Sequence, residues 1–206
     1  MATQVIVVGP LQVNCFVVAC EATHQALIID PGDEPTKILH YLSQNRLTAD
    51  YILLTHGHFD HLGAAAELAR RTGASVLAHP ADQVLIEQAS MHAALFGLPP
   101  PEPVQVDQWL THGQIIEWGQ LKGRVMETPG HSPGSISLLV DNQVFVGDVL
   151  FSRSIGRTDL PGGSYETLIR SIKEVLMALP DEVVVHCGHG PSTTIGRERR
   201  FNPFIA

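Results

Sequence analysis

One stretch of the chain, Thr55-His56-Gly57-His58-Phe59-Asp60-His61, places three imidazoles and one carboxylate within six consecutive positions. It directly follows the apolar run Tyr51–Leu54, which predicts a buried strand ending where the cluster begins. His56 and His58 are two residues apart and therefore project to the same side of an extended chain. Asp60 and His61 point elsewhere as the chain turns into a helix predicted over Leu62–Arg70. This spacing indicates two adjacent metal ions that are served by one loop.

The donor atoms of this cluster favour a catalytic metal site. Neutral imidazole nitrogen and carboxylate oxygen suit zinc, iron and manganese alike. The cluster contains no thiolate, which argues against a closed structural zinc site. Histidines that merely cap a loop or a helix end are the alternative, and the ligand spacing disfavours it.

Three later segments repeat the same arrangement of a polar residue after an apolar run. Loops rich in Gly and Pro hold such side chains at the rim of a sheet on a rigid backbone. The residues are His131 after Arg124–Glu127, Asp148 after Val144–Val146, and His189 after Val183–Val185. Five histidines and two aspartates therefore have a common structural reason to converge. Asp148 is the natural bridge between two ions, because a carboxylate has two oxygens whereas a neutral imidazole cannot bridge.

This pattern resembles the metallo-β-lactamase superfamily, in which His-X-His-X-Asp-His is followed by single downstream His, Asp and His residues. The resemblance covers nearly the whole chain. It includes Asp30-Pro31-Gly32, which is similar to the family's first motif, where the Asp is structural rather than a ligand. It implies two divalent metal ions, with zinc expected first and iron or manganese also suitable. The implied ligands are His56, His58 and His131 for one ion, Asp60, His61 and His189 for the other, and Asp148 for both.

Further segments are similar to glyoxalase II-like thioesterases of the small, single-domain type. These are Phe145–Phe151 with Ile155–Asp159, and Gly188–Arg199 leading to Asn202-Pro203-Phe204. The resemblance implies cleavage of S-acyl thioesters such as S-D-lactoylglutathione by a metal-bridging hydroxide, with Asp60 and Asp148 as catalytic residues. A thiolate departs without a strong general acid, which fits a site with no obvious protein acid beyond its ligands.

The chain departs from the larger glyoxalase II enzymes in the segment that follows Asp148. Leu150–Arg157 has no Lys and no Tyr where those enzymes present glutathione-binding side chains. We also expect this protein to lack the C-terminal helical domain that helps the larger enzymes hold glutathione. Arg153 and Arg157 are candidates to bind a substrate carboxylate instead. Solvated arginines, or an ion pair with Asp159, are the alternative interpretation.

The sequence is also compatible with two other functions. One is a persulfide dioxygenase, a group that resembles glyoxalase II and uses one iron held by two histidines and an aspartate. The other is a non-catalytic protein that binds a metal or a partner on the same scaffold, which the loss of any ligand would have favoured. No ligand is lost.

Composition and charge limit the class of protein. The 206 residues are 44% hydrophobic and 17% charged, which is ordinary for one globular domain, expected to span 1–206. The formal charge of −8 argues against nucleic-acid binding. No apolar run is long enough to span a bilayer, and an odd set of three cysteines argues against a disulfide framework. We expect a cytoplasmic protein with a small-molecule thioester substrate, no nucleic-acid or membrane partner, and an open oligomeric state.

Strands and helices alternate along the chain and predict an α/β fold, a four-layer αβ/βα sandwich with the ligands at one edge. Expected strands are Val5–Val8, Asn14–Ala19, Gln25–Ile29, Tyr51–Leu54, Ser75–Ala78, Arg124–Glu127, Ser135–Val140, Gln143–Val146 and Val183–His186. Expected helices are Pro35–Gln44, Leu62–Arg70, Ala81–Gln88 and Tyr165–Ala178.

The proline-rich segment Ser90–Asp107 breaks this alternation and predicts neither a helix nor a central strand. It is either a flap over the metal site that sets substrate choice or a surface excursion. The remaining histidines are expected not to bind metal: His24, His40, His79, His92, His112 and His186.

Overall fold

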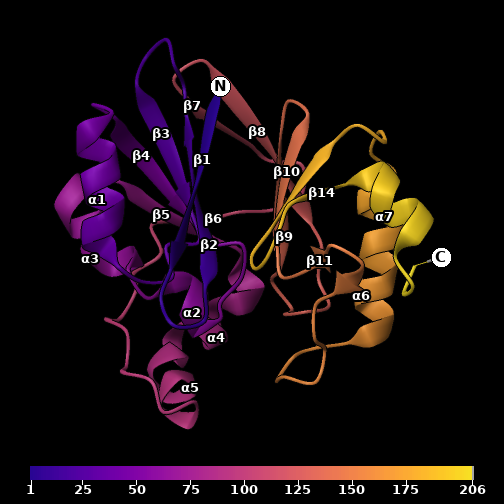
Figure 1. Cartoon of the computed structure of the whole chain (residues 1–206). Coiled ribbons are helices and arrows are strands. Elements are labelled where there is room, and N and C mark those ends of the chain that lie inside the picture. Colours follow the sequence, from indigo (N-terminus) through magenta and orange to yellow (C-terminus); the bar gives the residue numbers. More distant parts are fainter. Residues whose placement is uncertain (206) are drawn as a thin grey trace.

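Two six-stranded sheets lie face to face, and helices cover the outer face of each (Figure 1). The computed structural model describes residues 1–205. The first sheet has the order β1-β2-β3-β4-β5-β6 and the second β14-β13-β10-β9-β8-β7. This arrangement is the predicted four-layer αβ/βα sandwich.

The first half of the chain forms the first sheet and its helices. The strands are β1 (Ala2–Val8), β2 (Val13–Ala19), β3 (Gln25–Ile29), β4 (Thr48–Leu53), β5 (Ser75–Ala78) and β6 (Gln108–Trp109). The helices are α1 (Pro35–Gln44), α2 (Phe59–Leu62), α3 (Ala65–Thr72), α4 (Gln83–Glu87) and α5 (Ala89–Leu95), with a 3-10 turn at Pro80–Asp82. β1 to β3 pair antiparallel and β3 to β6 parallel, which confirms the predicted antiparallel start.

The second half forms the second sheet, a small hairpin and its helices. The strands are β7 (Ile115–Trp118), β8 (Leu121–Glu127), β9 (Ile136–Val140), β10 (Gln143–Gly147), β11 (Leu150–Phe151), β12 (Ser154–Ile155), β13 (Val184–Cys187) and β14 (Thr193–Thr194). The helices are α6 (Tyr165–Ser171), continued by a π-helical turn over Ile172–Leu176, and α7 (Ile195–Phe201).

The strands of both sheets alternate between two buried surfaces. On β3, Ile28 packs under α1 and α3, whereas Leu27 and Ile29 face the second sheet. Between the sheets, Trp118 is 1% exposed and its indole nitrogen donates to the carbonyl of Val18 at 2.9 Å. Because both faces are covered, these strands are apolar on both sides, as the sequence runs predict.

The largest difference from the sequence prediction lies in Ser90–Asp107. Its first part belongs to α5, because the residues before Leu98 contain no proline and the helix ends before the first one at Pro99. The expectation that this segment contains no helix was therefore wrong for Ala89–Leu95, while Gly97–Asp107 is irregular as expected.

The helix predicted over Leu62–Arg70 is divided in two. α2 begins three residues earlier at Phe59, and α3 ends at Thr72. Gly63 lies between them, where the carbonyl of Gly32 occupies the space that a side chain would need. Two of the candidate ligands, Asp60 and His61, consequently lie on a helical turn rather than in a loop.

The described helices are all too short or too polar to cross a membrane. Cys15, Cys20 and Cys187 are free and buried, in agreement with the expectation of no disulfide framework.

Candidate metal centre

All seven predicted ligands follow strands that end at the same edge of the two sheets. His56 and His58 follow β4, and the short helix α2 continues from them with Asp60 and His61. The remaining three come from the second sheet, with His131 after β8, Asp148 after β10 and His189 after β13. The sandwich therefore brings ligands from both halves of the chain to one place.

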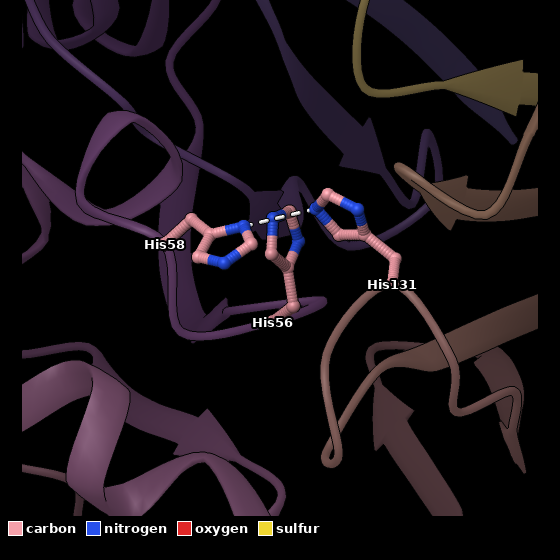
Figure 2. A group of neighbouring side chains, drawn as sticks. All are labelled: His56, His58 and His131. Carbon is pink, nitrogen blue, oxygen red and sulfur yellow. Dashed lines mark hydrogen bonds between the residues drawn. The ribbon is translucent and has the colours of Figure 1, made fainter. Parts of the chain in front are cut away.

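Three histidines form the first group of donor atoms. His56 and His58 belong to one loop and His131 to the facing loop, and their rings point toward one another (Figure 2). Nδ1 of His58 lies 2.9 Å from Nε2 of His131. One donor atom from each of the three lies within 4.8 Å of the others, and all three residues are buried. This group can hold one ion.

A second group consists of Asp60, His61 and His189, whose donor atoms also lie within 4.8 Å of one another. Nε2 of His61 is 3.7 Å from Oδ2 of Asp60, and Nε2 of His189 is 3.5 Å from the same oxygen. The mixed nitrogen and oxygen set suits a divalent transition metal.

Asp148 lies between the two groups. Its Oδ1 is 3.5 Å from Nε2 of His61, and its Oδ2 is 3.5 Å from Nε2 of His189. The same Oδ2 is 3.8 Å from Nε2 of His131, which belongs to the first group. The carboxylate is therefore placed to contact ions in both groups.

Hydrogen bonds to the outer ring nitrogen fix the tautomer of four of the five histidines. His61 Nδ1 donates to Asp30 at 3.0 Å, His131 Nδ1 to the Arg157 carbonyl at 2.8 Å, and His189 Nδ1 to the Leu11 carbonyl at 3.1 Å. Thr55 donates its hydroxyl proton to Asp30 and accepts from His56 Nδ1 at 3.1 Å. These bonds engage Nδ1 and leave Nε2 as the ring nitrogen that faces the centre and can bind a metal ion.

A second observation indicates that this set of donor atoms fits metal ions. Three buried atoms have no hydrogen-bond partner among the described residues, namely Nε2 of His56, Nε2 of His61 and Oδ1 of Asp148. An unpaired polar atom in the interior is costly unless something binds it. All three belong to the predicted ligands, so ions at this centre would satisfy them.

The charges within the centre shift its pKa values in opposite directions. Burial, together with nearby His131 and His61, lowers the pKa of His58 to about 3, and burial with His61 lowers that of His56. Burial opposes the charged form of His61, but the Asp148, Asp60 and Asp30 carboxylates raise its pKa well above the ordinary value. Burial likewise disfavours ionised Asp148, yet His61 and the other histidines hold its pKa below the usual range. The Asp148 carboxylate is thus charged and attracts cations.

Asp30 supports the ligands without being available as one itself. It is 1% exposed, and its Oδ1 accepts from the Thr55 backbone nitrogen at 2.8 Å. Its Oδ2 accepts from the Thr55 hydroxyl at 2.6 Å and from His61 at 3.0 Å. Although Asp30 lies close to His56 and His61, both of its oxygens are occupied by these bonds. This agrees with the structural role that the first motif implies.

The sequence did not reveal Asp82, which ties the ligand loops together. Its carboxylate accepts from the Gly57 nitrogen at 2.7 Å, from the Ser132 hydroxyl at 2.6 Å and from the Gly134 nitrogen at 2.6 Å. Asp82 is 1% exposed. In the sequence, Pro80-Ala81-Asp82 has the composition of an ordinary turn, so no signal distinguishes it.

Asn14 is a second residue that sequence reasoning missed. Its side-chain nitrogen donates to the carbonyl of Cys187 at 2.9 Å and to that of Gly190 at 2.8 Å. Its backbone nitrogen donates to Gly188 at 2.8 Å. These bonds fasten β2 to the loop that carries His189.

A cavity of about 520 Å³ opens over the centre. It is bounded by ligands of both groups, by residues of α5 and by the loop after β12. The lining ligands are His58, Asp60, His131, Asp148 and His189. The other lining residues are Leu11, Phe59, Leu85, Gln88, Met91, His92, Leu95, Phe96, Arg157, Leu160 and Pro161. Arg157 lines this cavity, and Arg153 is not among its described lining residues. The guanidinium of Arg157 donates to both oxygens of Asp159 at 2.7 Å, which lowers the pKa of Asp159 to about 2.

The profile of the metallo-beta-lactamase superfamily matches residues 8–189. The chain belongs to the metallo-β-lactamase superfamily. The hydroxyacylglutathione hydrolase GloC of Haemophilus influenzae is 38% identical over 209 residues, which cover 100% of this chain and 98% of that protein. Superfamily membership makes the chain a metallo-hydrolase by family, with a candidate site for metal ions.

Solved structures of the metallo-β-lactamase superfamily share this fold closely. The B3 metallo-beta-lactamase BLEG-1 is similar with a TM-score of 0.94 at 37% identity, and all of both chains is covered. TTHA1623, whose crystal structure is of a di-iron-bound form, has a TM-score of 0.90 at 42% identity, with 98% of this chain and 99% of that one covered.

Proposed function

We propose that this chain is a glyoxalase II-like thioesterase that uses two divalent metal ions. The observation that carries the proposal is the position of Asp148, which lies within 3.8 Å of histidine nitrogens from both donor groups. The identity with hydroxyacylglutathione hydrolase GloC supports the choice of thioesters. In this proposal Asp60 and Asp148 are the catalytic carboxylates. The ligands are those that the sequence predicts: His56, His58 and His131 for one ion, Asp60, His61 and His189 for the other, and Asp148 for both.

Bound by these residues, two divalent ions would supply a nucleophilic hydroxide near neutral pH and a Lewis acid for the substrate carbonyl. The chain itself fixes the histidine tautomers through Asp30, Thr55, and the carbonyls of Leu11 and Arg157. Apolar side chains, among them Phe59, Leu85 and Leu160, line the cavity beside the ligands. The thiolate product is a good leaving group, so the site needs no separate proton donor.

The nature of the metal belongs to the same proposal. Zinc is the expected metal, with iron or manganese also suited to a set of imidazoles and carboxylates. The di-iron form of TTHA1623 supports iron as an occupant of a similar fold. We further propose a cytoplasmic protein that acts on a small molecule and binds neither nucleic acid nor a membrane.

Metal analysis combined with thioester hydrolysis tests the proposal. We expect two metal equivalents per chain and metal-dependent release of thiol from S-D-lactoylglutathione or a simpler thioester. His61→Ala should lose activity and one metal equivalent. His40→Ala is the matched control, because His40 is exposed on α1 and should leave both unchanged.

Two outcomes would overturn the thioesterase assignment. One iron per chain with oxygen uptake on glutathione persulfide would assign a dioxygenase. Hydrolysis of a chromogenic β-lactam without hydrolysis of any thioester would assign the activity that the BLEG-1 name carries. Full activity of the metal-free protein would refute a metal-dependent reaction altogether.

A further inference from the structure

The cavity over the candidate centre has one apolar wall that the metal chemistry does not explain. Met91, Leu95 and Phe96, from α5 and the residue that follows it, line this wall. α5 projects from the first layer below α4 (Figure 1). The ring of Phe96 lies against Phe59, with centroids 5.4 Å apart, which anchors the helix end beside the ligand helix α2.

The apolar side chains of this wall are unusually exposed. The exposed fractions are 78% for Leu95 and 53% for both Met91 and Phe96. Leu11, on the turn between β1 and β2, also lines the cavity and is 40% exposed. A cluster of exposed apolar groups at a cavity mouth marks a surface that becomes covered by an apolar ligand.

The charges around the cavity do not complement a glutathione group. A glutathionyl arm carries two carboxylates and one ammonium at neutral pH, and binding it calls for basic side chains. Of the described residues that line the cavity, Arg157 alone is a Lys or Arg. Its guanidinium is already paired through two bonds with Asp159, so little positive charge is available to a substrate carboxylate.

We propose that the preferred substrate is a thioester with an apolar arm, held between α5 and the loop of Leu160 and Pro161, and that glutathione is not required as the thiol. This inference rests on the proposed thioesterase function and names its substrate class. Hydrolysis breaks the C–S bond, forms a C–O bond with water, and releases a carboxylate, a thiol and a proton. The apolar arm stays bound to the wall while the carbonyl faces the centre.

Two series of thioesters test this substrate class with the metal-loaded full chain. The first lengthens the acyl group on N-acetylcysteamine from acetyl to butyryl to hexanoyl, and the second lengthens the alkyl thiol of thioacetates over the same range. We expect kcat/KM to rise about fourfold per added methylene in at least one series, the gain expected for burying each methylene. S-D-lactoylglutathione serves as the polar comparison and should fall below the hexanoyl or hexyl ester.

A pair of variants assigns the preference to the wall. Leu95→Asn should reduce the six-carbon to two-carbon ratio of kcat/KM about fivefold. Ala94→Asn is the control, because Ala94 is an exposed neighbour on α5 that is not among the lining residues. Leu95 is itself largely exposed, so its replacement should not disturb folding.

The results separate this inference from the function on which it rests. Turnover that is equal along both series, or a Leu95→Asn ratio equal to that of Ala94→Asn, overturns the apolar arm and leaves the thioesterase standing. A kcat/KM for S-D-lactoylglutathione above that of every other ester does the same. Failure of the two-metal protein to cleave any ester overturns the thioesterase and the inference together.

Discussion

Gly57, which stands between His56 and His58, is in direct contact with Asp82. Its backbone nitrogen donates to the Asp82 carboxylate at 2.7 Å, and a Cβ on Gly57 would lie 3.0 Å from the Asp82 carbonyl oxygen. The same carboxylate accepts two bonds from the loop after His131. The spacing of the three-histidine group is therefore set by one buried side chain that is not a ligand.

Asp82→Asn should weaken that group specifically. An amide cannot accept from all three donors, so the free energy of unfolding should fall by about 1.5–3 kcal/mol. The affinity of the three-histidine group for its metal ion should fall roughly 10–100-fold, which is the usual effect of losing a group that orients ligands. Metal titration with a competing chelator measures this. Asp107→Asn is the control, because Asp107 accepts a similar bond from Val76 at the far end of β5. Equal metal affinities in the two variants would contradict the positioning role.

Asp30→Asn should act most directly on the group of Asp60, His61 and His189. Its carboxylate accepts from His61 Nδ1 at 3.0 Å and keeps that proton away from Nε2. An amide nitrogen facing the ring would favour the opposite tautomer, and affinity at the Asp60, His61 and His189 group should drop about 10–100-fold. Nitrogen NMR of labelled histidine reports the tautomer of His61 directly. An unchanged tautomer together with unchanged affinity would show that Asp30 does not orient the ring.

Asp148→Ala should abolish turnover and reduce the bound metal to one equivalent or less. The change removes the carboxylate whose two oxygens face both donor groups. Metal analysis after dialysis and a thiol-release assay measure the two effects. Glu166→Ala removes an exposed carboxylate on α6 and is expected to leave both values unchanged. Full activity of Asp148→Ala would refute the ligand assignment.

Removing the metals should destabilise the fold. A ligand that binds only the folded chain stabilises it by about 2.7 kcal/mol at a concentration one hundred times its Kd. For a domain of this size that corresponds to a fall in Tm of roughly 5–11 °C per ion removed. Scanning calorimetry before and after chelation measures the shift, and restored metal should reverse it. A Tm that does not respond to the chelator would argue that the centre binds no ion.

His186 gives a pH dependence that is separate from the metal centre. Its ring stacks on Phe145 and contacts Ser192 and Gln143, and burial lowers its pKa to about 4. Between pH 6.5 and pH 4 the unfolded chain binds a proton at this position that the folded chain does not. The free energy of unfolding should therefore fall as the pH drops through this window, with the full value present above pH 6.5. Urea unfolding of the wild type and of His186→Gln at several pH values measures this. If the free energy of unfolding changes with pH equally in the two proteins, His186 is not the cause.

The strands and the metal ligands could be predicted from the sequence because each is marked by a pattern of neighbouring residues. An apolar run followed by a polar residue with Gly beside it indicates a strand end, and His56, His131 and Asp148 all occur in that context. Short edge elements such as β6, with two residues, carry too little periodicity to be found this way. α5 is not predicted because the prolines at 99–101 and 103 dominate the composition of Ser90–Asp107, although they all follow the end of the helix.

Asp82 and Asn14 could not be predicted for a different reason. Each acts through hydrogen bonds to residues far along the chain, 50 positions for Asp82 with Ser132 and 173 for Asn14 with Cys187. Only the assembled sandwich brings these pairs together, and a single buried polar residue has no periodic signature. Local pattern therefore finds the ligands, whereas the groups that orient them are defined by tertiary contacts.

Each donor group takes its residues from both halves of the chain, so a bound ion would act as a reversible crosslink. An ion held by His58 and His131 closes a loop of 73 residues, in the way that a disulfide joins distant segments. Neither half alone can offer a complete set, and tight binding must wait until the two sheets have docked. The rate at which refolding chains capture metal from a coloured chelator would thus time the docking of the halves, which makes the ion a probe of the folding pathway.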